Sequence, residues 1–307
     1  MQQRTHAETV VPSGASPPGP GRWNAKGNPV YNLAGAWPFI LVHCLAFGAL
    51  WTPVATIDVT VGVALYWIRM FGITAGYHRY FSHRSYKTSR WFQFVLAMLA
   101  MSSSQKGVLW WAAHHRHHHK YSDRHNDIHS PKRHGLLYAH MGWVFNHTEN
   151  TDYTKVRDLA RYPELVLLNK YWGVPPVLLA VGIYWCLGLS GLFIGFMAST
   201  AVLWHGTFTI NSLTHMWGRP VYETGEDSKN SFLLALITMG EGWHNNHHYY
   251  QASAAQGFHW WQIDLTYYIL RLLGAAGLVW DLREVPEHVV ASHRLADRAT
   301  DAGSARR

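Results

Sequence analysis

Residues Trp110–Asp127 read Trp-Trp-Ala-Ala-His-His-Arg-His-His-His-Lys-Tyr-Ser-Asp-Arg-His-Asn-Asp and hold a dense group of histidines. On an α-helix, the spacing of His115, His118 and His119 places their side chains on one face, where they can converge on a single point. The alternative interpretation is a polar helix face that is rich in histidine and binds no metal. The interpretation of this stretch therefore depends on the rest of the chain.

Two further histidine groups favour a metal site. His78 and His83 lie upstream, and His244-Asn245-Asn246-His247-His248 repeats the His-x-x-His-His spacing downstream. Imidazole groups gathered in this way are typical of a transition-metal site. Because one ion takes at most about six ligands, the eight histidines predict two ions. The full pattern of carboxylate-bridged di-iron bundles, which needs two Glu-x-x-His segments and two further Glu, is missing, so we expect a centre dominated by histidine.

The rest of the chain has the composition of a membrane protein. Its 307 residues include 16 Trp and 16 Tyr, and long apolar stretches accompany them. Four stretches approach the roughly 20 residues that a helix needs to cross a bilayer: about 37–53, 57–75, 172–189 and 191–210. The sequence therefore predicts an all-α integral membrane protein with two transmembrane hairpins. The apolar segment 91–101 is too short to span, and we expect an interfacial or re-entrant helix there.

The distribution of basic residues predicts the orientation. No Lys or Arg occurs from Asn28 to Ile68 or from Tyr171 to Gly218, which includes both hairpin turns. The positive-inside rule then assigns all the basic segments to the cytoplasm. With four spans, both termini and every histidine group lie on that side, in a helical cap formed by 76–170 and 211–283. His215, at the cytoplasmic end of the last span, becomes a further candidate ligand.

The predicted membrane and cap segments form one domain, residues 26–283. Residues 1–25 are rich in Pro, Gly and Ser without an apolar core segment, so we expect a disordered tail and not a signal peptide. Residues 284–307 are expected to be a C-terminal tail. The segment 258–280 is aromatic, but the charges of Asp264 and Arg271 make a spanning helix costly, so it is expected to lie along the cap or interface.

A formal net charge of +8 suits anionic lipid or an acidic partner or substrate. Nucleic-acid binding is the competing interpretation of a basic chain. It is disfavoured here because the basic residues surround histidine groups and apolar spans. Cys44 and Cys186 both lie in apolar segments, which argues against a disulfide framework.

In these motifs the chain resembles the membrane fatty acid desaturases, and most closely the acyl-CoA Δ9-desaturase (stearoyl-CoA desaturase) family. The resemblance covers about residues 37–282. Its carriers are the segments His78–Lys87, His115–Lys120 with His125–His129, Asn211–His215 and Gly240–His248. The resemblance implies four transmembrane helices under a cytoplasmic cap that holds two irons. The implied ligands are His78, His83, His115, His118, His119, His215, His244, His247 and His248, with Asn211 contacting a metal through water.

The resemblance also implies roles around the metals. His114 and His117 fall at positions that are not ligands. The groups that would orient ligand imidazoles are His125, Asp127, His129 and Glu241, for which a purely structural role is an equal alternative. The residues that would line a bent acyl tunnel are Gln105, Trp111, Thr207 and Phe208, with ordinary packing as the alternative. Phe208 stands where the animal enzymes have Trp.

The implied reaction uses O₂ and two reduced irons to form a cis double bond, with Δ9 favoured. An unactivated methylene group has no acidic proton and no leaving group, so an oxidant is needed. A separate electron donor such as cytochrome b5 or ferredoxin is expected. Acyl-CoA is the favoured carrier, but Ala113-His114 replaces the Arg-Asp pair that the animal enzymes use near the CoA nucleotide. No counterpart of their Trp-Arg-Asn segment is found either, so acyl carrier protein and intact lipid stay open.

Two other functions compete with desaturation. A hydroxylase acting on a fatty acid or a sterol would use similar histidine motifs. A metal-handling membrane protein would need ionisable ligands at mid-membrane depth. The ionisable side chains of note in the spans are His43 and His205, with Asp58 and Arg69 near the ends of the second span. The motif spacing and the 211–215 segment therefore favour the desaturase.

Overall fold

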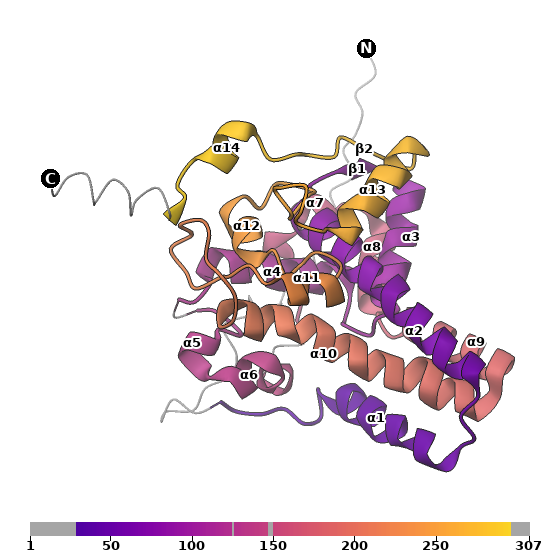
Figure 1. Ribbon diagram of the computed structural model, residues 1–307. Helices are drawn as coiled ribbons and strands as arrows, with labels where there is room; N and C mark the ends of the chain where they lie inside the picture. The colour runs from indigo at the N-terminus through magenta and orange to yellow at the C-terminus, as the bar shows by residue number, and fades with distance from the viewer. Residues whose placement is uncertain (1–28, 125, 147–149, 296–307) are drawn as a thin grey trace, which may run out of the picture.

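The computed structural model describes residues 29–124, 126–146 and 150–295, and nearly all its regular structure is helical (Figure 1). The first half contains α1 (Trp37–Ala46), η1 (Phe47–Trp51), α2 (Thr56–Phe71), η2 (Gly72–Ser82), β1 (Lys87–Thr88), α3 (Arg90–Met101), α4 (Val108–Tyr121), α5 (Pro131–His134), α6 (Leu136–His140) and η3 (Gly142–Phe145). The second half contains η4 (Tyr153–Lys155), α7 (Arg157–Ala160), α8 (Pro163–Lys170), α9 (Val174–Ser190), η5 (Gly191–Ala198), α10 (Ser199–Ser212), η6 (Leu213–His215), α11 (Phe232–Ile237), α12 (His244–Tyr249), α13 (Leu265–Ala275), β2 (Val279–Trp280) and α14 (Glu287–Ala291).

Two helical segments of the described chain are long and apolar enough to cross a membrane, Thr56–Ser82 and Val174–His215. The second is interrupted at Gly188, whose φ of 67° and ψ of −157° are not helical. Glycine adopts this conformation readily because it has no Cβ. The interruption lies next to the turn that the sequence predicts between the third and fourth spans. The predicted first span corresponds to α1 and η1, which are shorter than a spanning helix.

Both long helices continue beyond the predicted ends of their spans. The second predicted span ends near residue 75, but the helix runs through η2 to Ser82. The fourth ends near residue 210, but the helix continues to His215. In each case the extension carries predicted ligands beyond the predicted span without a loop. A rigid helical connection of this kind holds a metal ligand more accurately than a flexible linker would.

Arg69, His43 and His205, which lie in the predicted spans, make hydrogen bonds to side chains of neighbouring helices. The guanidinium of Arg69 on α2 is fully buried, and it donates to Thr200 Oγ1 at 2.6 Å and Ser199 Oγ at 2.8 Å. His205 on α10 lies 3.1 Å from His43 of α1 and 3.0 Å from His140 of α6, nitrogen to nitrogen. These contacts join α1, α2, α6 and α10. They leave His43, His140 and His205 linked by hydrogen bonds.

The segments predicted to form the cap pack around η2 and α4. The short strands β1 and β2 pair antiparallel, with Lys87 opposite Trp280. α3 has the 12 residues Arg90–Met101, and Ser89 caps its first turn by accepting from Phe92 N. α13 begins after Asp264, whose buried carboxylate accepts from Tyr267 N at 2.9 Å. Arg271 is on the exposed side of α13. The two charges that disfavoured a spanning helix therefore lie at the N-terminus of α13, for Asp264, and on its exposed face, for Arg271. The tail predicted at 1–25 lies outside the described residues.

Candidate metal centre

Four elements supply the predicted ligands. His78 lies in η2 with His83 directly after it, three ligands come from α4, His215 ends η6, and three come from α12. The π-helical winding of η2 matters here, because His83 N donates to His78 O five residues back at 3.2 Å. Five residues carry a side chain well past one turn of an α-helix, whereas the wider π turn returns it close to the same face. His78 and His83 therefore point to the same place.

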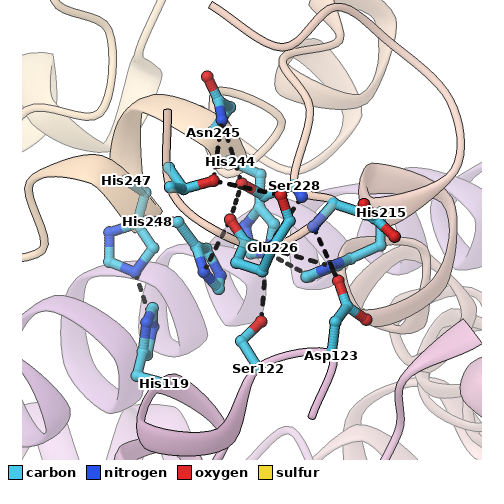
Figure 2. A network of polar contacts seen from close by, with 12 residues as sticks. His119, Ser122, Asp123, His215, Glu226, Ser228, His244, Asn245, His247 and His248 are labelled. Carbon is cyan, nitrogen blue, oxygen red and sulfur yellow. Dashed lines mark hydrogen bonds and ion pairs between the residues drawn. The ribbon is translucent and has the colours of Figure 1, made fainter. Parts of the chain in front are cut away.

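The nine predicted histidine ligands divide into two groups. In each, the candidate ligand atoms lie within 4.8 Å of one another. The five-histidine group is His78, His83, His115, His119 and His247. The four-histidine group is His118, His215, His244 and His248. α4 and α12 each contribute to both groups. Figure 2 shows His119 facing His247, and the rings of His248 and His215 in the other group have centroids 5.4 Å apart. The geometry therefore matches two neighbouring metal ions, as the residue count predicts.

Distances between facing nitrogens support this assignment. Nε2 of His115 lies 2.9 Å from Nε2 of both His83 and His119. Nε2 of His215 lies 3.2 Å from Nε2 of His244 in the other group. Nitrogens that share one metal ion at about 2.1 Å are about 3 Å apart when their bonds are perpendicular. The buried Nε2 of His248 has no hydrogen-bond partner among the described residues, as expected for an atom reserved for a metal.

Burial keeps most of these imidazoles in the form that binds metals. It lowers the pKa of six predicted ligand histidines well below the ordinary value, helped by the neighbouring rings: His83, His115, His119, His244, His247 and His248. A neutral ring has a lone pair for a metal, whereas an imidazolium has none. The residues present therefore fit two transition-metal ions of the kind that imidazole binds.

Two predicted orienting carboxylates contact the outer nitrogens of predicted ligand rings. Glu241 Oε2 lies 2.5 Å from His78 Nδ1, and Asp127 Oδ1 lies 3.0 Å from His118 Nδ1. Burial works to lower the pKa of His118, but the charge and hydrogen bond of Asp127 outweigh it and the pKa is raised. A carboxylate on the outer nitrogen fixes the tautomer and leaves Nε2 for the metal. This is the arrangement expected for Glu241 and Asp127 as orienting groups.

Two further carboxylates at the centre were not predicted. Asp123 Oδ2 lies 2.9 Å from Nδ1 of His215, and Glu226 approaches the same nitrogen at 3.5 Å and His248 Nδ1 at 3.6 Å (Figure 2). Asp123 is within the histidine-rich stretch itself, so its proximity in sequence was an available signal. Glu226 is in a loop with no motif around it. Only folding brings that loop to the four-histidine group.

Behind Glu241 is a buried ionic network that the sequence also did not reveal. Arg79 Nη2 lies 3.2 Å from Glu241 and 3.0 Å from Asp264, and all three side chains are almost fully buried. Gln256 Nε2 donates to the other Glu241 oxygen at 2.7 Å. Burial works to raise the pKa of Glu241, but His78 and Arg79 outweigh it and the pKa is lowered. The carboxylate thus stays ionised and holds the His78 ring in place.

The remaining predicted residues divide into three cases. His129 is buried with its ring 4.4 Å from that of His118, and burial lowers its pKa to about 3. His114 stacks on Trp110 with ring centroids 3.8 Å apart, and His117 Nε2 lies 2.8 Å from Asn126 O. Both lie outside the two ligand groups. His125 falls outside the described residues.

The four predicted tunnel residues line one cavity beside the metal centre. Gln105 Nε2 donates to Thr207 Oγ1 at 3.1 Å, and Trp111 Nε1 donates to Gln105 Oε1 at 3.4 Å. Trp111 also stacks on His115 of the five-histidine group, with ring centroids 4.9 Å apart. The inner cavity, as we call it, is lined by Gln105, Trp110, Trp111, His114, His115, Ile128, His129, Trp143, Thr207, Phe208 and Asn211. An apolar chain in this cavity would lie against a ligand of the metal centre.

Comparison with known proteins agrees with this site. Residues 49–283 match the family model of the fatty acid desaturases. The palmitoyl-monogalactosyldiacylglycerol delta-7 desaturase of Arabidopsis thaliana is 34% identical over 73% of this chain and 62% of its own length. The sn-1 stearoyl-lipid 9-desaturase of Anabaena variabilis is 35% identical over 73% of this chain and 84% of its own. An acyl-CoA 5-desaturase of Anemone leveillei is 31% identical over 81% of each chain.

The match includes all nine histidines that the structure gathers into two groups. The chain therefore belongs to the fatty acid desaturase family.

Proposed function

We propose that this protein is an O₂-dependent fatty acyl desaturase that introduces a cis double bond into a saturated acyl chain. The observation that carries the proposal is the inner cavity, which passes from the Gln105–Thr207 hydrogen bond to the ring of His115. The overall reaction consumes one O₂, two electrons and two protons, removes two hydrogens from neighbouring methylene carbons and yields two waters. Two irons, when bound, would supply the oxidising power for this chemistry.

The chain's own residues supply ligands, orientation and exclusion of water. The nine histidines of the two groups would hold the irons, and Asn211, which lines the cavity beside them, would contact one through water. Trp111 and Phe208 give the cavity apolar walls, and the Gln105–Thr207 bond places a fixed polar contact across it. A chain held in one conformation presents a single carbon pair to the metals.

The position of the double bond and the carrier vary among the relatives. The three described above are named for positions 7, 9 and 5, and for galactolipid, lipid and CoA carriers. We propose position 9, in line with the resemblance of the histidine motifs. The substrate is an acyl chain on a thioester or a lipid. We propose no nucleic-acid partner.

We further propose that the chain crosses the membrane four times, with both termini and the metal centre in the cytoplasm. The two long helical segments, the break at Gly188 and the absence of Lys and Arg from both predicted hairpin turns support this topology. Electrons would come from a separate donor such as cytochrome b5 or ferredoxin. A surface hollow that reaches His83 and His119 has Arg116 and Lys120 in its wall, which suits a donor with an acidic face.

The test is the fatty-acid profile of a desaturase-deficient host that expresses this chain, beside the His118→Ala variant. We expect a new monounsaturated acid that disappears in the variant, and mass spectrometry of a derivative would locate the double bond. A hydroxy acid in its place would show that the protein is a hydroxylase. Stable, membrane-inserted protein with a supplied electron donor and no product would refute the acyl substrate.

A further inference from the structure

A wide apolar groove opens on the side of the helical layer, between α1 and α9. We call it the lateral groove, and it is lined by Trp37, Pro38, Leu41, Val42, Ser104, Lys170, Tyr171, Trp172, Gly173, Val174, Pro176, Val177, Leu178, Ala180, Phe196 and Met197. Its walls face outward, since Trp37 is 60% exposed and Val177 59% exposed. In the proposed topology this surface meets lipid. Lipid tails would then cover the apolar side chains exposed in the groove, so no protein partner is needed there.

The lateral groove leads toward the metal centre. It shares Pro38, Ser104 and Trp172 with a second hollow, the middle cavity. The middle cavity is lined by Gly35, Ala36, Pro38, Phe39, Ser104, Gln105, Lys106, Trp110, Trp111, Trp143, Val144, Trp172, Trp204 and Phe208. It shares five of these with the inner cavity: Gln105, Trp110, Trp111, Trp143 and Phe208. The three hollows thus adjoin in sequence from the outer surface to His115.

Fixed charge along this path is found in the lateral groove and the middle cavity, and not among the described lining residues of the inner cavity. Among the described lining residues of the three hollows, Lys106 and Lys170 are the side chains with a fixed charge. Lys106 Nζ lies 4.7 Å from the centre of the Trp172 ring, and Lys170 Nζ lies 5.3 Å from that of Tyr171. Lysines beside Trp and Tyr are typical of the level where lipid headgroups begin.

The backbone around Lys106 is held in place. Its φ is 69° and that of Ser104 is 60°, a left-handed conformation that costs energy in residues with a Cβ. The hydroxyl of Tyr77 donates to Lys106 O at 2.6 Å. Trp204 Nε1 donates to Ser103 O at 2.8 Å from α10. The loop that separates the lateral groove from the middle cavity is therefore anchored from two sides, with Lys106 at its rim.

We propose that the acyl chain enters sideways from the bilayer, between α1 and α9, while it is still esterified to a membrane lipid. The inference rests on the proposed desaturase function and specifies its carrier. The methyl end would pass Trp172 into the middle cavity and then reach His115, while the headgroup stays at the Lys106 and Lys170 rim. Two lysines beside aromatic rings suit one lipid phosphate or glycerol ester. The several phosphates of CoA would find no further fixed cation on this path.

The test narrows the lateral groove without touching the metal centre. Val177→Trp places a large ring in its wall, and Val181→Trp is the matched control on the same helix, 47% exposed and outside the lining of the groove. Each protein is reconstituted in phosphatidylcholine nanodiscs with iron, reductant and an electron donor. The probes are phosphatidylcholine with a deuterated stearoyl chain and the same chain as stearoyl-CoA.

We expect the wild-type protein to desaturate the lipid-linked chain faster than the CoA thioester. Val177→Trp should lower that lipid-linked rate about tenfold or more, because chain placement controls the rate steeply, and Val181→Trp should leave it unchanged. In parallel, a phosphatidylcholine with a diazirine on its acyl chain should crosslink to α1 and α9. Val177→Trp should reduce this crosslink, and the readout does not depend on turnover.

The outcomes separate the two proposals. A wild-type protein that desaturates stearoyl-CoA alone, with Val177→Trp as active as wild type, would overturn lateral entry and leave the desaturase function intact. Crosslinking at α1 and α9 that Val177→Trp abolishes, without an alkene from either probe, would support lateral entry and overturn desaturation. Crosslinking to α1 and α9 that is as strong in Val177→Trp as in Val181→Trp would also overturn lateral entry.

Discussion

Replacing Glu241 by glutamine removes the negative charge that His78 and Arg79 share, and we expect metal binding to suffer more than the fold. Glutamine has the same shape, and Asp264 still lies 3.0 Å from the Arg79 guanidinium, so the buried cation keeps one carboxylate. The loss in the free energy of unfolding should then be about 1–3 kcal/mol, the cost of a weakened buried hydrogen bond and not of an unpaired charge.

The effect on the metal centre follows from the 2.5 Å contact between Glu241 and His78 Nδ1. Without the carboxylate, the His78 ring loses its fixed tautomer and part of its basicity. Loss of such an orienting group typically lowers metal affinity about 10–100-fold. The assay is iron per chain by mass spectrometry after dialysis against graded chelator, with the unfolding temperature measured on the same samples.

Glu164→Gln is the matched control for Glu241→Gln. Glu164 also pairs with an arginine, at 2.7 Å from Arg90, but on the exposed surface. We expect it to keep wild-type iron affinity and nearly wild-type stability, because exposed ion pairs contribute little. If Glu241→Gln retains iron as well as Glu164→Gln does, the assignment of Glu241 as an orienting group is refuted.

Two further predictions follow from the site and the helical layer. Asp123→Asn removes the carboxylate 2.9 Å from His215 Nδ1. Because this carboxylate contacts only the four-histidine group, we expect the iron content to fall toward one ion per chain. An unchanged content of two ions per chain would refute the role of Asp123 in positioning His215. Arg69→Leu leaves the buried hydroxyls of Ser199 and Thr200 on α10 without their donor. We expect a loss of about 1–3 kcal/mol in the free energy of unfolding and a fall of several degrees in the unfolding temperature of the membrane-inserted protein. The iron content should stay unchanged. A drop in iron at constant stability would contradict the second prediction.

Much of the metal centre could be predicted from the sequence because its ligands come in short local patterns. On α4 and α12, positions i, i+3 and i+4 share a helix face whatever the rest of the fold does. His78 and His83 were harder, since five residues do not share a face on an ordinary α-helix. The π-helical winding of η2 brings them together, and the histidines themselves were the signal.

The partners of the ligands were predictable only in part. Asp127 and Glu241 lie inside recognisable motifs, and the structure places each against a ligand ring. Glu226 and Gln256 have no such context, and their roles depend on loops that return to the centre from elsewhere in the chain. The same holds for His205, which joins His43 and His140 across three helices.

The sequence by itself determined which atoms are available to bind metal and which segments are apolar, because helical periodicity and hydropathy are local properties of the chain. The tertiary structure alone decided the division of nine histidines into groups of five and four, the burial of Arg79 between Glu241 and Asp264, and the path from the lateral groove to His115. These features depend on distances between residues far apart in the chain. Such distances are set by the packing of α1, α4, α9, α10 and α12 against one another, which no short pattern encodes.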